Sequence, residues 1–178
     1  SFAYKHWEGV VPDPGALTEA DTALLAAVEG GFESVAKEME AVHLRAALGE
    51  AMRLASEVNR YLDVTAPWTA IKTDRQAAAR AVFTALKAID SLKVLLSPFL
   101  PFTSERLHTF LGGQGPLFGS QVVETRSDAL GEHSVLMYDG SAASGKWEPS
   151  RLQPGQKLEQ PGPLFKKLDV SIVEFERG

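Results

Sequence analysis

Residues 18–42 of this chain, TEADTALLAAVEGGFESVAKEMEAV, decide its fold class. Thr18, followed three residues later by Asp21, has the pattern of a capping box at the start of a helix. Gly30-Gly31 interrupts the composition without interrupting the period, so we expect one helix with a weak or bent point there. Apolar side chains recur at steps of three and four and trace one face of that helix: Leu24, Leu25, Val28, Phe32, Val35, Met39 and Val42.

Two more amphipathic helices are predicted after this one. The second helix begins near His43, and its predicted apolar stripe is Leu44, Leu48, Met52, Ala55, Val58 and Leu62. The third opens at Thr73, where Gln76 completes another capping box, and it ends by Ser97 because Pro98 disfavours helical geometry before it. Its predicted stripe is Val82, Leu86, Ile89, Leu92 and Leu96.

These helices predict an all-α fold, an antiparallel helix bundle with an irregular C-terminal extension. A short fourth helix, Thr103 to Leu111, stops at the glycine pair that follows it. Phe2–Trp7 is expected to be the C-terminal end of a truncated first bundle helix. We therefore assign residues 1–112 to the bundle and residues 113–178 to the extension.

The extension is rich in glycine, proline and serine, and the helical period is lost in it. Val122-Val123 and Val135–Tyr138 are candidate short strands. Trp147 stands in a Gly/Ser-rich loop and is expected to be a small surface anchor. Leu164-Phe165 places two large apolar side chains in a polar tail, and such a pair is expected to dock onto another surface.

Composition excludes several classes of site. The chain has no cysteine, which rules out disulfide bonds and thiolate-bound zinc. No apolar run approaches the roughly 18 residues of a membrane span, and no signal peptide is visible, so a cytoplasmic location is expected. The net charge is −5, yet residues 45–93 carry eight bases against five acids. This excess belongs either to solvated helix faces or to a cationic surface for a phosphate backbone.

The candidate binding residues lie where the second helix ends. Pro67 fixes its own φ and suits the first position of a helical turn, so the adjacent Trp68 would stand on a rigid backbone. A Trp in such a place offers a flat face on which an unpaired base can stack. Asn59, Arg60 and Asp63 are within a turn or two and would supply polar groups for the base edges. The alternative is that Trp68 simply plugs the end of the bundle.

The stretch EVNRYLDVTAPWTAIK, Glu57 to Lys72, resembles the signature of the methionyl-tRNA synthetase family. In that family an Asn-x-Tyr-hydrophobic stretch runs into Ala-Pro-Trp and a downstream Lys. Three other stretches are similar to family segments, and the resemblance covers most of residues 1–112 and the tail: SFAYKHW (1–7), LSPFLPFTSERLHTFLG (96–112) and PGPLFKKLD (161–169).

The resemblance implies a class I synthetase anticodon-binding domain and gives the candidate residues roles. Trp68 would stack on an anticodon base of methionine tRNA, and Pro67 would fix its position. Asp63 matches an acid that helps to reject wrong tRNAs, because its charge repels phosphate or mispairs with a wrong base edge. Asn59 and Arg60 are weaker candidates for the same anticodon contact.

The resemblance also implies a parent enzyme, methionine–tRNA ligase, that uses ATP, Mg and Zn. The ATP-binding signatures of that enzyme, His-Ile-Gly-His and Lys-Met-Ser-Lys-Ser, do not occur in this sequence. The fragment alone is therefore expected to be inactive, with no catalytic residue, no metal and no cofactor. Its expected partners are the anticodon loop and the parent's own catalytic domain, toward which residues 113–178 would pack, and neither a membrane nor DNA.

A different class of function stays open on the residues alone. The acidic segment 8–40 and the Leu164-Phe165 tail favour a helical protein-interaction module without an RNA role. A self-contained enzyme is the least favoured hypothesis, because no nucleophile–base pair or metal-ligand spacing is present in the sequence.

Overall fold

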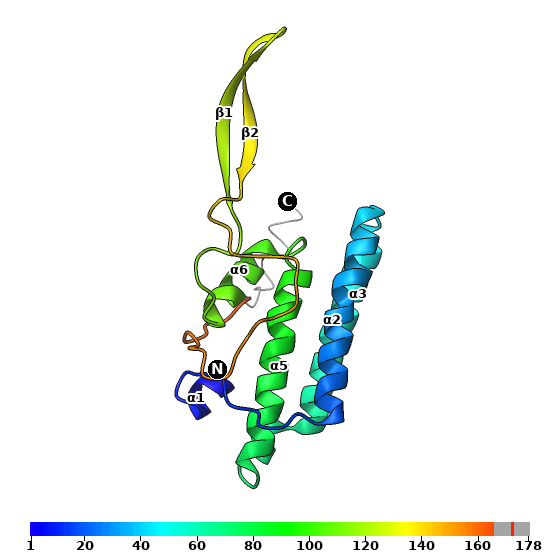
Figure 1. The fold of residues 1–178 in the computed structure, drawn as a ribbon, viewed down its shortest axis with the longest axis vertical. Coiled ribbons are helices and arrows are strands. Elements are labelled where there is room, and N and C mark those ends of the chain that lie inside the picture. The colour runs from blue at the N-terminus through cyan, green and yellow to red at the C-terminus, as the bar shows by residue number, and fades with distance from the viewer. Residues whose placement is uncertain (166–171, 173–178) are drawn as a thin grey trace.

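The computed structural model describes residues 1–165 and Ile172, and helices dominate it (Figure 1). The long helices pack against one another as the sequence predicts, and α6 lies across the upper half of α5. The elements in chain order are α1 (Phe2–His6), α2 (Glu19–Glu40), α3 (Leu44–Thr65), α4 (Pro67–Ala70), α5 (Arg75–Leu95), α6 (Pro101–Phe110), β1 (Ser120–Asp128) and β2 (Gly131–Asp139).

Helix α2 begins with the predicted capping box. The Asp21 backbone N–H donates to Thr18 Oγ1 at 3.4 Å, and the Thr18 backbone N–H donates to Asp21 Oδ2 at 2.7 Å. The helix continues through Gly30-Gly31 without a break. Gly31 is buried, and a Cβ at this position would collide with the side chain of Leu54. The expected single helix is confirmed, and Gly31 is a point of close helix packing.

The predicted apolar stripe of α3 is displaced from the observed core. Met52, expected inside, is 49% exposed, and Leu48 is only partly buried. The core face of α3 instead consists of Ala47, Ala51, Leu54, Val58 and Tyr61. The small alanines let α2 and α5 approach closely, and Leu54 fills the space beside Gly31. Leu48 and Met52 of the predicted stripe thus lie toward the flanks of α3, whereas Val58 is buried as predicted.

Helix α5 begins after a cap different from the predicted one. The N-cap residue is Asp74, whose Oδ1 accepts from the Ala77 backbone N–H at 2.9 Å. Gln76 does not cap, because its side-chain amide donates to the Asp13 carbonyl at 3.3 Å. The predicted capping box at Thr73 and Gln76 is therefore wrong by one position, although the helix itself is confirmed.

Helix α5 is shared by two apolar clusters. One joins it to α2 and α3. The second joins it to α1 and to segments from the far end of the chain, and consists of Ala3, Val11, Val82, Phe83, Leu111, Leu152 and Leu158. An isolated β-bridge between Val10 and Lys157 joins the segment after α1 to the C-terminal segment in the same region. The extension therefore returns to the bundle beside α1.

Strands β1 and β2 form an antiparallel hairpin that projects from the helices (Figure 1). Val123 pairs with Leu136 in its centre, so the candidate strands of the sequence are present and are longer than expected. Arg106 of α6 contacts the chain well after the hairpin, where it donates to the carbonyls of Pro163 and Leu164 at 2.6 and 3.0 Å. Leu164 is partly buried and Phe165 is exposed. The part of the PGPLFKKLD tail from residue 166 to residue 169 lies outside the described residues.

The described residues contain no membrane-crossing helix and no cluster of metal ligands. No helix in this part of the chain has both the length and the apolar character that crossing a membrane requires. Likewise, within residues 1–165 no three acidic or histidine side chains come together as metal ligands.

Candidate nucleic-acid interface

A left-handed residue ends α3 and sets the direction of α4. Ala66 has φ 37° and ψ 59°, and its N–H still donates to the Leu62 carbonyl at 2.9 Å. Pro67 is the first residue of α4, where its missing N–H costs no helical hydrogen bond. The Ile71 N–H donates to the Pro67 carbonyl at 3.0 Å and closes the turn. Backbone hydrogen bonds of Ala66, before Trp68, and of Ile71, after it, therefore fix the backbone that carries the indole.

The sequence leaves two roles open for Trp68, a stacking surface and a plug at the end of the bundle. In the structure the buried residue at this end is Pro67, and Trp68 keeps an exposed face. Pro67 is less than 2% exposed and seals the end of the bundle. Trp68 is 49% exposed, so about half of a large aromatic surface remains available to a ligand. Burial of the proline and exposure of the indole together give an aromatic platform on a rigid support.

The polar candidates lie on the adjacent turns of α3. Asn59 and Asp63 are exposed and four residues apart, so they occupy one face of the helix. Arg60 is also exposed, but its guanidinium bonds the Glu57 carboxylate one turn earlier. Asn59 and Asp63 are therefore available to base edges, whereas the positive charge of Arg60 is largely compensated.

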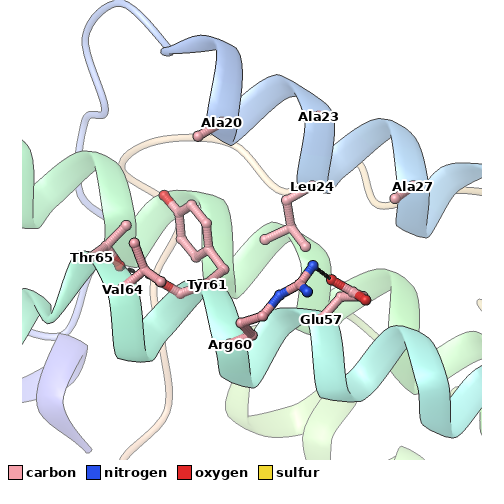
Figure 2. A pocket seen from close by; sticks show the side chains of 9 residues that line it. All are labelled: Ala20, Ala23, Leu24, Ala27, Glu57, Arg60, Tyr61, Val64 and Thr65. Carbon is pink, nitrogen blue, oxygen red and sulfur yellow. Dashed lines mark hydrogen bonds and ion pairs between the residues drawn. The ribbon is translucent and has the colours of Figure 1, made fainter.

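A groove of about 380 Å³ runs beside these residues between α2 and α3 (Figure 2). Its α2 wall is formed by three alanines and Leu24, and Figure 2 shows Arg60 and Glu57 bonded to each other on the α3 side. The lining residues are Ala20, Ala23, Leu24, Ala27, Glu57, Arg60, Tyr61, Val64 and Thr65.

A buried polar contact beside the groove holds the end of α3, and no sequence pattern indicated it. The Tyr61 hydroxyl donates to Asp21 Oδ1 at 2.5 Å, and Arg80 Nε lies 3.4 Å from Asp21 Oδ2. Burial by itself would raise the pKa of Asp21, but the hydrogen bonds from Tyr61 and Thr18 and the charge of Arg80 hold it below its ordinary value. Burial and the Asp21 contact raise the pKa of Tyr61. Asp21 thus stays charged, and Tyr61 stays neutral.

Carboxylates neutralise half of the cationic run in residues 45–93. Four of its eight bases form ion pairs, which are Arg53–Glu50, Arg60–Glu57, Arg80–Asp21 and Lys93–Asp90. Within the described part of the chain, no carboxylate oxygen lies within 4.0 Å of the basic groups of Lys72 or Arg75. The positive charge that remains near Trp68 therefore belongs to Lys72, in the connection between α4 and α5, and to Arg75, the first residue of α5.

Residues 11–135 match the family model described as the anticodon binding domain of methionyl tRNA ligase. The chain belongs to this family. The matched region contains α2 to α6, with the Asn59–Trp68 segment inside it. The reported relatives give no support to the alternative of a protein-interaction module.

Curated relatives of this anticodon-binding domain are much longer than the chain. A protein named methionine–tRNA ligase from Thermomicrobium roseum is 49% identical over 99% of this chain and 30% of its own length. The protein of the same name from Chloroflexus aggregans is 47% identical over 99% of this chain and 29% of its own length. The chain therefore spans about 30% of the relatives that it matches.

Solved structures show the same fold. Free methionyl-tRNA synthetase of Mycobacterium tuberculosis has a TM-score of 0.73 to this chain at 23% identity, and the match covers 95% of this chain and 30% of that one. The enzyme bound by methionyl-adenylate gives 0.70 at 24% identity, over 93% and 29% of the two chains. The likeness extends over most of the chain, so it includes much of the segment that follows α6.

Proposed function

We propose that this chain recognises the anticodon loop of methionine tRNA as part of a methionine–tRNA ligase. The observation that carries the proposal is the half-exposed indole of Trp68 directly after the sealed Pro67. Family membership supports the assignment, because the matched description is an anticodon binding domain. Trp68 stacks on an anticodon base, and stacking of this kind contributes about 1–3 kcal/mol per base.

The neighbouring residues divide the remaining work. Pro67 fixes the backbone under Trp68, and Asn59 offers an amide to a base edge. Asp63 discriminates by repulsion, since an exposed carboxylate disfavours a phosphate or an acceptor edge that approaches it. Arg60 contributes less than its charge suggests, because Glu57 already occupies its guanidinium.

The rest of the ligase reaction belongs to the remaining two thirds of the parent protein. ATP, Mg and Zn are used there in this proposal, and residues 1–178 supply only tRNA recognition, in the cytoplasm. Residues 113–178 pack toward that catalytic domain, and the exposed Phe165 is the side chain that fits such a contact.

The test is binding of the 178-residue chain to a methionine-tRNA anticodon stem-loop at low salt. Trp68→Ala is expected to weaken binding by about 1–3 kcal/mol while the helical content stays unchanged. Phe102→Ala is the matched control, because this aromatic side chain is 86% exposed on α6 and is expected to leave affinity unchanged.

A loop with one altered anticodon base should bind the wild-type chain more weakly. The difference between the two loops should shrink in Trp68→Ala, since the variant no longer contacts the base. Equal affinity of Trp68→Ala and wild type for the unaltered loop contradicts the assignment of Trp68.

A further inference from the structure

The side chain of Arg75 is held in one orientation at the start of α5. Its Cζ lies 5.4 Å from the centroid of the Trp7 ring, so the guanidinium rests over the indole. Its Nη2 donates to the carbonyl of His6 at 2.7 Å. The Trp7 ring is itself held, because Phe2 packs edge-on at 6.0 Å between centroids.

This arrangement leaves most of the guanidinium free for a ligand. An arginine carries five N–H donors, and the His6 carbonyl accepts from one nitrogen only. The residue is exposed, and no carboxylate among the described residues lies within ion-pair distance of it. The neighbouring acid, Asp74, is occupied as the N-cap of α5. A planar, pre-oriented and uncompensated guanidinium is suited to bidentate binding of a phosphate.

Arg75 lies at the same end of the bundle as Trp68. Only the last two residues of α4 and the connection 71–74 separate the two residues along the chain. In Figure 1, α1 lies beside the lower half of α5, the half at which the chain enters from α3 and α4. The uncompensated charge of Arg75 and the half-exposed indole of Trp68 therefore both lie at this end of the bundle.

We propose that Arg75, oriented by Trp7, binds a backbone phosphate of the RNA loop whose base stacks on Trp68. The inference rests on the proposed function and adds to it the contact that supplies charge. The sequence alone suggests Arg60 as the arginine that contacts RNA, because it lies close to the Pro67-Trp68 pair and in the same signature. The structure favours Arg75 instead, because Arg60 is paired with Glu57. A phosphate contact fixes the position of the loop and does not distinguish one base from another.

The experiment measures binding of the 178-residue chain to the methionine-tRNA anticodon stem-loop over a range of salt concentrations. Arg75→Ala should weaken binding on the order of tenfold at low salt, because a charge-assisted contact is lost. Its salt slope should fall by about 0.7 on a single strand, as one phosphate contact disappears. Arg75→Lys should keep the slope and lose part of the affinity, because the ammonium keeps the charge without the planar fork.

Arg53→Ala is the matched control, since it removes an exposed arginine of α3 whose charge is paired with Glu50. It should change neither the affinity more than about twofold nor the salt slope. The Arg75→Ala loss should also be the same for a loop with an altered anticodon base, whereas the Trp68→Ala loss should differ between the two loops. A changed fold alone would not lower the salt slope in this selective way.

The outcomes separate the inference from the proposed function. If wild type binds the loop and Arg75→Ala binds as tightly with the same salt slope, the phosphate contact is overturned and the anticodon assignment stands. If Arg60→Ala lowers the salt slope and Arg75→Ala does not, the contact belongs to Arg60. If wild type does not bind the loop at all, both the function and the inference fail.

Discussion

At the scale of single residues, the Tyr61 hydroxyl joins the end of α3 to the start of α2, since it donates to Asp21 Oδ1 at 2.5 Å in a buried place. Tyr61→Phe should lower the free energy of unfolding by about 1–3 kcal/mol, because it leaves a buried carboxylate with one partner fewer. Urea unfolding followed by circular dichroism measures this loss.

Tyr138→Phe provides the matched control for that prediction. Its hydroxyl also makes a hydrogen bond, accepting from the Gly119 N–H at 2.6 Å, but the side chain is exposed on the hairpin. Water replaces that partner, so the loss should stay within about 0.5 kcal/mol. Equal losses in the two variants would mean that the Asp21 contact contributes nothing special to stability.

At the scale of elements, the sequence predicts the long helices, but it misplaces the N-cap of α5 by one residue and misses contacts that depend on packing partners. The capping box of α2 was predictable, because Thr18 and Asp21 act within one turn. The register of α3 was not, because burial of Ala47 and Ala51 depends on how closely α2 and α5 approach. The candidate residues Pro67 and Trp68 could be proposed from the sequence, whereas Arg75 could not, because its contacts His6 and Trp7 lie 69 and 68 positions earlier in the chain.

We expect the hairpin to contribute little to the stability of the bundle. Its strands pair over their whole length, and Val123 and Leu136 are both exposed in its centre. Two-stranded hairpins alone are marginally stable in water, so this one adds little to the stability of its support. Replacing residues 120–139 by a short Gly/Ser link should change the free energy of unfolding by less than about 1 kcal/mol, measured by urea unfolding.

The comparison variant for this deletion is Trp147→Ala, in the loop that follows the hairpin. Trp147 Nε1 donates to the Phe32 carbonyl at 3.0 Å, and the two rings meet edge to face at 5.5 Å. This side chain is the anchor that the sequence suggested, and its removal should cost about 1–3 kcal/mol. A hairpin deletion as costly as Trp147→Ala would show that the strands support the bundle.

At the scale of the whole molecule, the buried side chains of Lys93 and His108 fasten the segment after the hairpin to α5 and α6. Lys93 Nζ lies 3.1 Å from His108 Nδ1, and Ser144 Oγ lies 3.2 Å from His108 Nε2. Ser144 donates its own hydroxyl proton to the Pro116 carbonyl at 2.8 Å, so it accepts from Nε2–H. Lys93 then donates to Nδ1, and the arrangement requires a neutral imidazole.

Acid should therefore loosen this attachment. Burial first, and then the charge of Lys93, lower the pKa of His108 below its ordinary value of 6.5. Between that lowered pKa and about 6.5 the unfolded chain binds a proton that the folded chain does not, so stability falls as the pH falls through this window. The slope from one such group is at most about 1.4 kcal/mol per pH unit.

Urea unfolding between pH 7 and pH 5 measures the effect, and His108→Gln should flatten the dependence, because the amide keeps an acceptor for Lys93 without titrating. His133→Gln is the matched control, since that imidazole is exposed on the hairpin, and it should leave the dependence as in wild type. The Asp21 carboxylate adds a further loss only near and below its ordinary pKa of 3.8, because its own pKa is lowered in the fold. A wild-type slope that persists in His108→Gln would place the titrating group elsewhere than in the contact that closes the extension onto the bundle.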